Sequence, residues 1–216
     1  MDKRPLQKIC WFWHGVSPWA KRWFTDISAY NHGMAKLPFY EGANLYFVTF
    51  TLNKHVHLFK NAIYRDIVID SLKFCVNQRH LRIFAYVIMS SHLHLIVFDS
   101  NYNNKRLKTT IDQFRSFTAH EILKKLKVNN PDLLLNFIEK SRTDREYRIW
   151  TDGFHAIGLD TEQKLKQRFD YIHNNPVKAL LVEDPKQWIY SSASYWEDGE
   201  IGPLPIHHFL DVDENG

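Results

Sequence analysis

The segment "RIFAYVIMSSHLHLIVFDS" (residues 82–100) contains two apolar runs that are separated by Ser90 and Ser91. β-Branched and aromatic residues favour strands, and two strands joined by a two-residue turn form an antiparallel hairpin. Because alternate side chains of a strand share a face, His92 and His94 point to the same side. The leucines between and after them point to the opposite side, towards a predicted core.

Further elements are predicted around this hairpin. Residues 44–52 ("NLYFVTFTL") have the composition of a strand, and residues 61–80 predict a helix because apolar residues recur at roughly helical spacing. These residues are Ile63, Ile67, Leu72 and Phe74. Residues 106–127 predict an amphipathic helix with many basic side chains. The order β-α-β-β-α is typical of an α+β sandwich, an antiparallel sheet with helices on one face. The other face, or an edge of it, would then be free for a ligand.

A last helix is predicted over residues 161–175, "TEQKLKQRFDYIHNN". We expect Asp160 to cap its first turn, with Gln163 three positions later, and Pro176 to end it. A buried stripe is formed by Leu165, Phe169 and Ile172.

The chain has 216 residues, which suffices for one domain with an extension. We expect an N-terminal extension (1–42), a single domain (43–200) and a C-terminal tail (201–216). Apolar residues make up 44% and charged residues 24%, and the net charge of +4 permits a nucleic-acid partner without requiring one. Because the chain has only two cysteines, we expect a cytoplasmic protein. Because it has no apolar run of about 18 residues, we expect no membrane span.

Two histidines on one strand face could give two imidazole nitrogens to one metal ion. So short a motif also recurs by chance, and the alternative is a hydrogen-bonded pair without a metal. Tyr171 and Asn175 are four residues apart and share a helix face, so a helix laid against the sheet could aim both at one point. The alternatives are a tyrosine at the edge of the core and a turn asparagine before Pro176.

The motif "SHLHLIV" resembles the histidine–hydrophobic–histidine (HUH) motif of single-tyrosine transposases. "FDYIHNNPVKALLVEDPKQWIYSS" resembles the second signature of one branch, the REP-associated tyrosine transposases, and residues 113–122 and 149–156 resemble segments between the two. The likeness runs from about residue 44 to 196. It implies a ferredoxin-like core. It also implies Tyr171 as the catalytic nucleophile and a divalent ion, Mg²⁺ or Mn²⁺, held by His92, His94 and Asn175.

The resemblance further implies a metal-dependent single-strand DNA endonuclease and strand transferase that acts on hairpin or palindromic repeat DNA. Its tyrosine would form a 5′-phosphotyrosyl intermediate. Lys108, Arg115 and Lys178 are candidate DNA contacts, although a solvated basic face is the alternative for the helix. Two positions depart from the family pattern: Leu180 replaces a usual glycine and Thr151 a usual glutamine.

Other functions remain open from the sequence. One alternative is a catalytically silent protein that binds hairpin DNA or RNA. Another is a metal-binding ferredoxin-like protein without a nucleic-acid partner. A homodimer is possible and a monomer is not excluded. His155 and His173 receive no role.

Overall fold

A computed structural model describes residues 45–139, 146–152 and 155–208. The expected extension (1–42) lies outside these residues, and the expected tail is described only to residue 208. The described strands are β1 (Tyr46–Thr51), β2 (Leu81–Ile88), β3 (His92–Asp99) and β4 (His155–Gly158). They form one antiparallel sheet in the order β2-β3-β1-β4. With a helix after β1 and another after β3, this is the β-α-β-β-α-β ferredoxin-like arrangement, and the predicted α+β fold class is confirmed.

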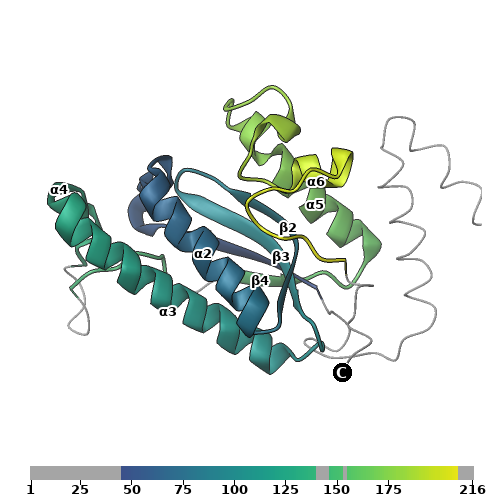
Figure 1. Cartoon of the computed structure of the whole chain (residues 1–216), viewed down its shortest axis with the longest axis horizontal. Coiled ribbons are helices and arrows are strands. Elements are labelled where there is room, and N and C mark those ends of the chain that lie inside the picture. The colour runs from purple at the N-terminus through teal and green to yellow at the C-terminus, as the bar shows by residue number, and fades with distance from the viewer. Residues whose placement is uncertain (1–44, 140–145, 153–154, 209–216) are drawn as a thin grey trace, which may run out of the picture.

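Helices cover both faces of the sheet. The α-helices are α2 (Ala62–Gln78), α3 (Asn104–Asn129), α4 (Pro131–Leu134), α5 (Glu162–Lys178) and α6 (Ala193–Asp198). Short 3-10 turns cover Asn53–His55, Leu58–Lys60, Leu135–Phe137 and Pro185–Gln187. Helices α2 and α3 run side by side, whereas α5 and α6 form a separate group (Figure 1). The face that we expected to be free is thus partly covered by α5.

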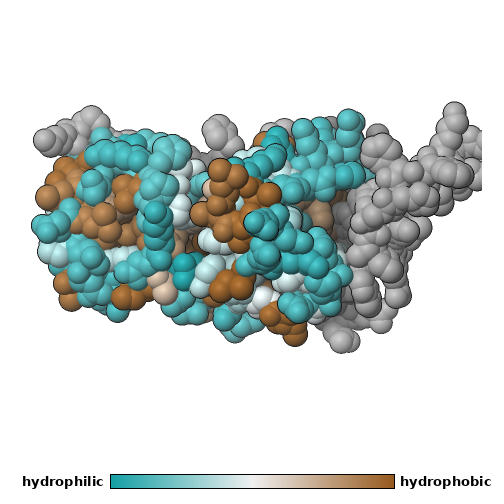
Figure 2. Space-filling model, turned by 90° about the horizontal axis from the view of Figure 1, so that it is seen from above, coloured by the Kyte–Doolittle hydropathy of each residue, from teal (hydrophilic) through white to brown (hydrophobic). Residues whose placement is uncertain are grey.

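The outer surface is mixed in character. Figure 2 shows one side of the molecule, on which hydrophobic patches are separated by hydrophilic ones. Single exposed apolar side chains are normal on a folded protein and do not by themselves mark a binding face. In the part of the chain that the structure describes, no helix is both long and apolar enough to cross a membrane.

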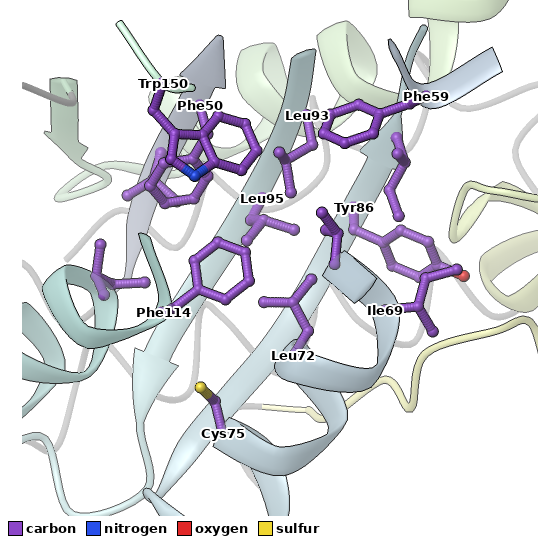
Figure 3. Close-up of a cluster of buried hydrophobic side chains, with 14 of the residues drawn as sticks. Phe50, Phe59, Ile69, Leu72, Cys75, Tyr86, Leu93, Leu95, Phe114 and Trp150 are labelled. Carbon is purple, nitrogen blue, oxygen red and sulfur yellow. The ribbon is translucent and has the colours of Figure 1, made fainter. Parts of the chain in front are cut away.

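The β2–β3 hairpin separates two apolar layers. Ser90 and Ser91 form its turn, which is closed by a 2.8 Å hydrogen bond from the Met89 amide to the His92 carbonyl. Leu93 and Leu95 point from β3 into the larger core under α2 and α3 (Figure 3). A smaller apolar layer lies between the opposite face and α5 and α6, and its members include Phe47, Phe84, Ile96, Leu165, Ile172 and Trp196. The imidazoles of β3 therefore belong to the face on which α5 packs.

The helix predicted over residues 61–80 is present as α2, but the apolar residues that predicted it do not share one buried face. Leu72 is completely buried and Ile67 packs against the core, whereas Ile63 and Phe74 are 43% and 53% exposed and Tyr64 and Val68 are buried instead. The helix contains apolar residues on more than one face, so its own pattern does not decide which face is buried. The contacts with α3 and the sheet decide it.

Both ends of α5 differ from the prediction. Thr161, not Asp160, is the N-cap, and its side chain accepts a 3.2 Å hydrogen bond from the Lys164 amide. Asp160 instead pairs with the Lys164 ammonium at 2.7 Å. Pro176 lies inside the helix, which continues to Lys178. A proline in the last turn removes only one backbone donor, so a turn that is closed by other hydrogen bonds can tolerate it.

Those other bonds form a Schellman motif. The Leu181 amide donates to the Pro176 carbonyl at 3.0 Å, and the Leu180 amide donates to the Val177 carbonyl at 2.9 Å. Leu180 adopts the left-handed conformation, with a φ of 56°, and its side chain is 91% exposed. The turn expected for glycine is therefore present with leucine in its place.

Replacing Leu180 by glycine is expected to raise the free energy of unfolding by about 0.5–1 kcal/mol, because glycine carries no Cβ penalty at positive φ. Urea unfolding measures the change. Ala179→Gly is the matched control: Ala179 has a φ of −83°, so this variant gains nothing in the folded state and should be less stable. Equal effects of the two substitutions would contradict a strained Leu180.

Asp99 joins the end of β3 to the start of α3. Its carboxylate is 1% exposed and accepts two hydrogen bonds from the Arg106 guanidinium, at 2.7 and 2.6 Å. The amides of Asn101 and Asn103 also donate to it, at 2.9 and 3.1 Å. Burial alone would raise the pKa of Asp99, but Arg106 and the two amides together hold that pKa below its usual 3.8.

Arg106→Met should lower the free energy of unfolding at pH 7 by about 2–3 kcal/mol, because it leaves a buried carboxylate without its counter-charge. Since the pKa is depressed in the folded state, this stabilisation exists above pH 3.8 and is lost as the pH falls through the folded value. The difference between wild type and variant should therefore shrink in acid. Denaturant titrations at several pH values test this. Lys108→Met, which removes an exposed pair with Asp112, should change stability by less than about 1 kcal/mol.

Candidate active site

The register of the sheet places the two histidines beside threonines of β1. His92 lies opposite Thr51, and His94 lies opposite Thr49. Side chains that are directly opposite in an antiparallel pair share a face, so these four project together. The two imidazole rings are 4.9 Å apart between centroids. The predicted pairing of the histidines on one face is thus present in the folded chain.

Helix α5 brings its own side chains to this pair. The Tyr171 ring lies edge-on to His94, with 5.1 Å between centroids, and also contacts Phe47 at 5.9 Å. One turn later, the Asn175 side chain lies close enough to His92 to raise its pKa. Two segments about eighty residues apart in the sequence therefore place His92, His94, Tyr171 and Asn175 in one group.

His94 is the deeper of the two imidazoles and is only 4% exposed. Its Nδ1 lies 2.8 Å from the Thr49 hydroxyl, while its buried Nε2 has no hydrogen-bond partner within the described chain. Burial, followed by the positive charges of His92 and Arg168, lowers the pKa of His94 to about 3. At neutral pH the ring is uncharged. The threonine fixes one nitrogen, and the other remains available to a ligand.

His92 lies nearer the surface. Its Nδ1 is 3.2 Å from the Ser91 hydroxyl. Burial lowers the pKa of His92 below its usual 6.5. The nearby Asn175 side chain acts in the opposite direction, and His55 and His57 lower the pKa further. Both imidazoles are therefore predominantly neutral at pH 7, the form that binds a metal.

The side chains present suit a divalent cation that takes three of its ligands from the protein. Two neutral imidazoles and one amide oxygen can be supplied by His92, His94 and Asn175. No group of three histidine, cysteine, aspartate or glutamate side chains suited to a metal occurs in the described residues. Mixed nitrogen and oxygen donors that leave positions open for phosphate and water suit Mn²⁺ or Mg²⁺. The partnerless Nε2 of His94 is the atom that such an ion would satisfy.

The structure adds one cation that the sequence reasoning missed. The Arg168 guanidinium lies over the Phe47 ring, 5.0 Å from its centroid, and is close enough to His94 to lower its pKa. Arg168 is three residues before Tyr171, a spacing that shares a helix face. A search at helical spacing in both directions from Tyr171 would have selected Arg168 as well as Asn175.

The three candidate DNA contacts lie in different places. The Lys178 ammonium is 5.7 Å from the Tyr171 ring centroid, beside the site. Lys108 and Arg115 belong to α3, which packs on the opposite face of the sheet. Lys108 pairs with Asp112, and the Arg115 guanidinium donates to the Thr151 carbonyl at 2.7 Å.

Two further histidines, His155 and His173, had no predicted role. His173 is buried, its Nε2 is 2.8 Å from the Ser192 hydroxyl, and burial lowers its pKa to about 3. It joins α5 to the start of α6 and does not belong to the site. The side chain of His155 lies outside the described residues.

Thr49→Val should lower the affinity for Mn²⁺ by about 10- to 100-fold, because the His94 ring loses the hydroxyl that fixes its tautomer and orientation. Calorimetric titration of the metal-free protein with Mn²⁺ measures this. Thr51→Val, on the same face and the same strand, is the control and should leave the affinity unchanged. Equal losses in both variants would assign the effect to strand packing rather than to the hydroxyl.

Comparisons with known proteins agree with the fold. No protein-family model and no curated protein matches the chain. Among solved structures, a REP-associated tyrosine transposase bound to a REP hairpin matches with a TM-score of 0.51 and 17% identity, over 82% of this chain and 93% of that one. A putative transposase from Deinococcus radiodurans R1 matches with a TM-score of 0.41 and 15% identity, over 65% and 97%. At 17% identity, the first of these shows a shared fold.

Proposed function

We propose that the chain is a metal-dependent tyrosine endonuclease and strand transferase that acts on single-stranded or hairpin DNA. One observation carries this proposal: Tyr171 lies against His94, whose buried Nε2 has no hydrogen-bond partner among the described residues, and Asn175 is close enough to His92 to raise its pKa. A protein that only binds DNA has no need for a hydroxyl nucleophile beside two neutral imidazoles and an amide.

The proposed reaction is the one that the family resemblance implies, with Tyr171 as the nucleophile. The Tyr171 oxygen attacks a phosphodiester, forms a 5′-phosphotyrosyl bond and releases a 3′-hydroxyl. A divalent cation held by His92, His94 and Asn175 would supply positive charge to the phosphate. Arg168 lies one turn before the tyrosine and Lys178 two turns after it, and they can bind the phosphates on either side. Because the phosphotyrosyl bond conserves the energy of the broken bond, another 3′-hydroxyl can reverse the step without ATP.

Hairpin DNA is the proposed substrate class for two reasons. The solved transposase that shares the fold is bound to a REP hairpin. The second signature in this chain resembles that branch of transposases, and the segment "FDYIHNNPVKALL" forms the helix and the turn that carry Tyr171 and Asn175.

A covalent-adduct assay tests the proposal. Hairpin oligonucleotides with single-stranded flanks are labelled at either the 5′ or the 3′ end and incubated with protein and Mn²⁺, then separated on a denaturing gel. A 5′-phosphotyrosyl bond predicts that the 3′-end label stays with the protein and that the 5′-end label is released. EDTA should abolish both products. Salt-sensitive binding without any adduct, over a broad set of hairpins, would favour the silent binding protein instead.

A further inference from the structure

A groove of about 570 Å³ lies between α2 and α3, on the face of the sheet away from the candidate site. Its floor contains the buried side chains of Cys75 and Phe114 (Figure 3). Phe74 of α2 and Phe117 of α3 line its upper part, and these two rings are 53% and 57% exposed. Adjoining helices thus present apolar side chains to one shared groove, which a single exposed residue does not do.

Two hydrogen bonds show that α2 and α3 run in opposite directions. At the start of α2, the Tyr64 hydroxyl accepts a 2.8 Å hydrogen bond from the side-chain amide of Asn130, the residue that ends α3. At the other end, the Thr110 hydroxyl, near the start of α3, donates to the carbonyl of Arg79, the C-cap of α2, at 3.5 Å. The end of the groove at the beginning of α2 is therefore formed by the later part of α3.

The groove is acidic at one end and basic at the other. Asp70 of α2 and Glu121 of α3 line the first end. Arg79 lines the second, where its guanidinium lies 5.9 Å from the centroid of the Phe74 ring. Asp70 and Arg79 are separated by about 13 Å along the helix axis, at 1.5 Å for each residue. Opposite charges therefore flank an apolar middle.

We propose that this groove binds the same groove of a second copy of the chain, so that the protein forms a two-fold symmetric dimer. Two-fold symmetry brings identical surfaces together. With the axis perpendicular to the helices and level with Phe74 and Phe117, the acidic end of each chain faces the basic end of its partner. An axis parallel to the helices would place Asp70 and Glu121 against their own copies. Charge therefore selects the first arrangement, in which the groove is complementary to itself.

The two parts of the groove act differently in this dimer. The four phenylalanine rings at its centre supply most of the affinity, because they leave water on association. The charged ends determine the orientation, since exposed ion pairs add little affinity but like charges brought together oppose association. The candidate active site lies across the sheet, so both sites stay open. The dimer does not depend on the proposed function.

Sedimentation velocity of the full chain over a wide concentration series tests the proposal. The mass should rise from that of one chain to that of two. Phe74→Glu and Phe117→Glu each place a charge in the apolar middle and should weaken association by about 30-fold or more. Thermal unfolding checks that both variants fold. Leu180→Glu, at a 91% exposed leucine after α5 on the other side of the sheet, is the control and should associate like wild type.

Exchange of charges tests the orientation. Arg79→Glu makes both ends of the groove acidic, and the double substitution Asp70→Lys with Glu121→Lys makes both ends basic. Each of these chains should be monomeric alone, and an equimolar mixture should form heterodimers, because every acidic end then faces a basic one. A wild-type chain that stays monomeric throughout would overturn the proposal. Dimers that survive both phenylalanine substitutions, or that ignore the charge changes, would place the interface elsewhere and overturn it too.

Discussion

Replacing Tyr171 by phenylalanine is expected to abolish the covalent adduct and to lower the rate of strand cleavage by about 10³-fold or more, because the attacking atom itself is removed. The substitution deletes a single oxygen. The ring keeps its contacts with Phe47 and His94, so the fold and the proposed metal ligands should be unaffected. A large loss of rate with unchanged stability is the signature of a nucleophile rather than of a packing residue.

Single-turnover cleavage of a 3′-labelled hairpin measures the rate, and thermal unfolding checks the fold. Binding of the same hairpin, followed by fluorescence anisotropy, should be unchanged. Tyr195→Phe is the matched control, since Tyr195 lies on α6 in ring contact with Trp196 and should be dispensable. Mass spectrometry of the trapped peptide identifies the attached residue. An adduct that persists in Tyr171→Phe would require another nucleophile.

The architecture could be predicted because it follows from short-range patterns. The β2–β3 hairpin was predicted from two strand-like runs and its serine turn, and the alternation along β3 predicted that Leu93 would be buried opposite the two histidines. The buried face of α2 could not be read in this way. Its apolar residues occupy more than one face, so only the partners that pack against it select Tyr64 and Val68 over Ile63.

The candidate site, too, could be predicted from the sequence only in part. Helical spacing alone grouped Tyr171 with Asn175, and the same spacing contains Arg168, which was overlooked. The contact between residues 53–59 and the hairpin turn could not be predicted from the sequence, because that segment is irregular and its position depends on hydrogen bonds to Ser90 and Ser91 from a separate part of the chain.

Replacing His94 by alanine should abolish the rise in melting temperature that Mn²⁺ is expected to cause. The His94 Nε2 is buried without a hydrogen-bond partner in the described part of the chain, and an unsatisfied buried polar atom costs about 1–3 kcal/mol. A cation that binds this atom in the folded state alone stabilises the fold by mass action, by about 2.7 kcal/mol at one hundred times its dissociation constant. Wild type should therefore melt at a higher temperature in saturating Mn²⁺ than in EDTA, and His94→Ala should melt at the same temperature in both.

The comparison works because the shift with metal is measured within each variant. Alanine leaves a cavity and lowers stability on its own, but that loss is common to the Mn²⁺ and EDTA samples and cancels. His120→Ala, an exposed histidine on α3 across the sheet, should keep the full Mn²⁺ shift. Calorimetric titration should show that His94→Ala loses about 100-fold or more in Mn²⁺ affinity, since one of the two proposed imidazole ligands is gone. If Mn²⁺ raised the melting temperature of all three proteins equally, the ion would bind elsewhere, and Tyr171 would have to act without a cation at the two histidines.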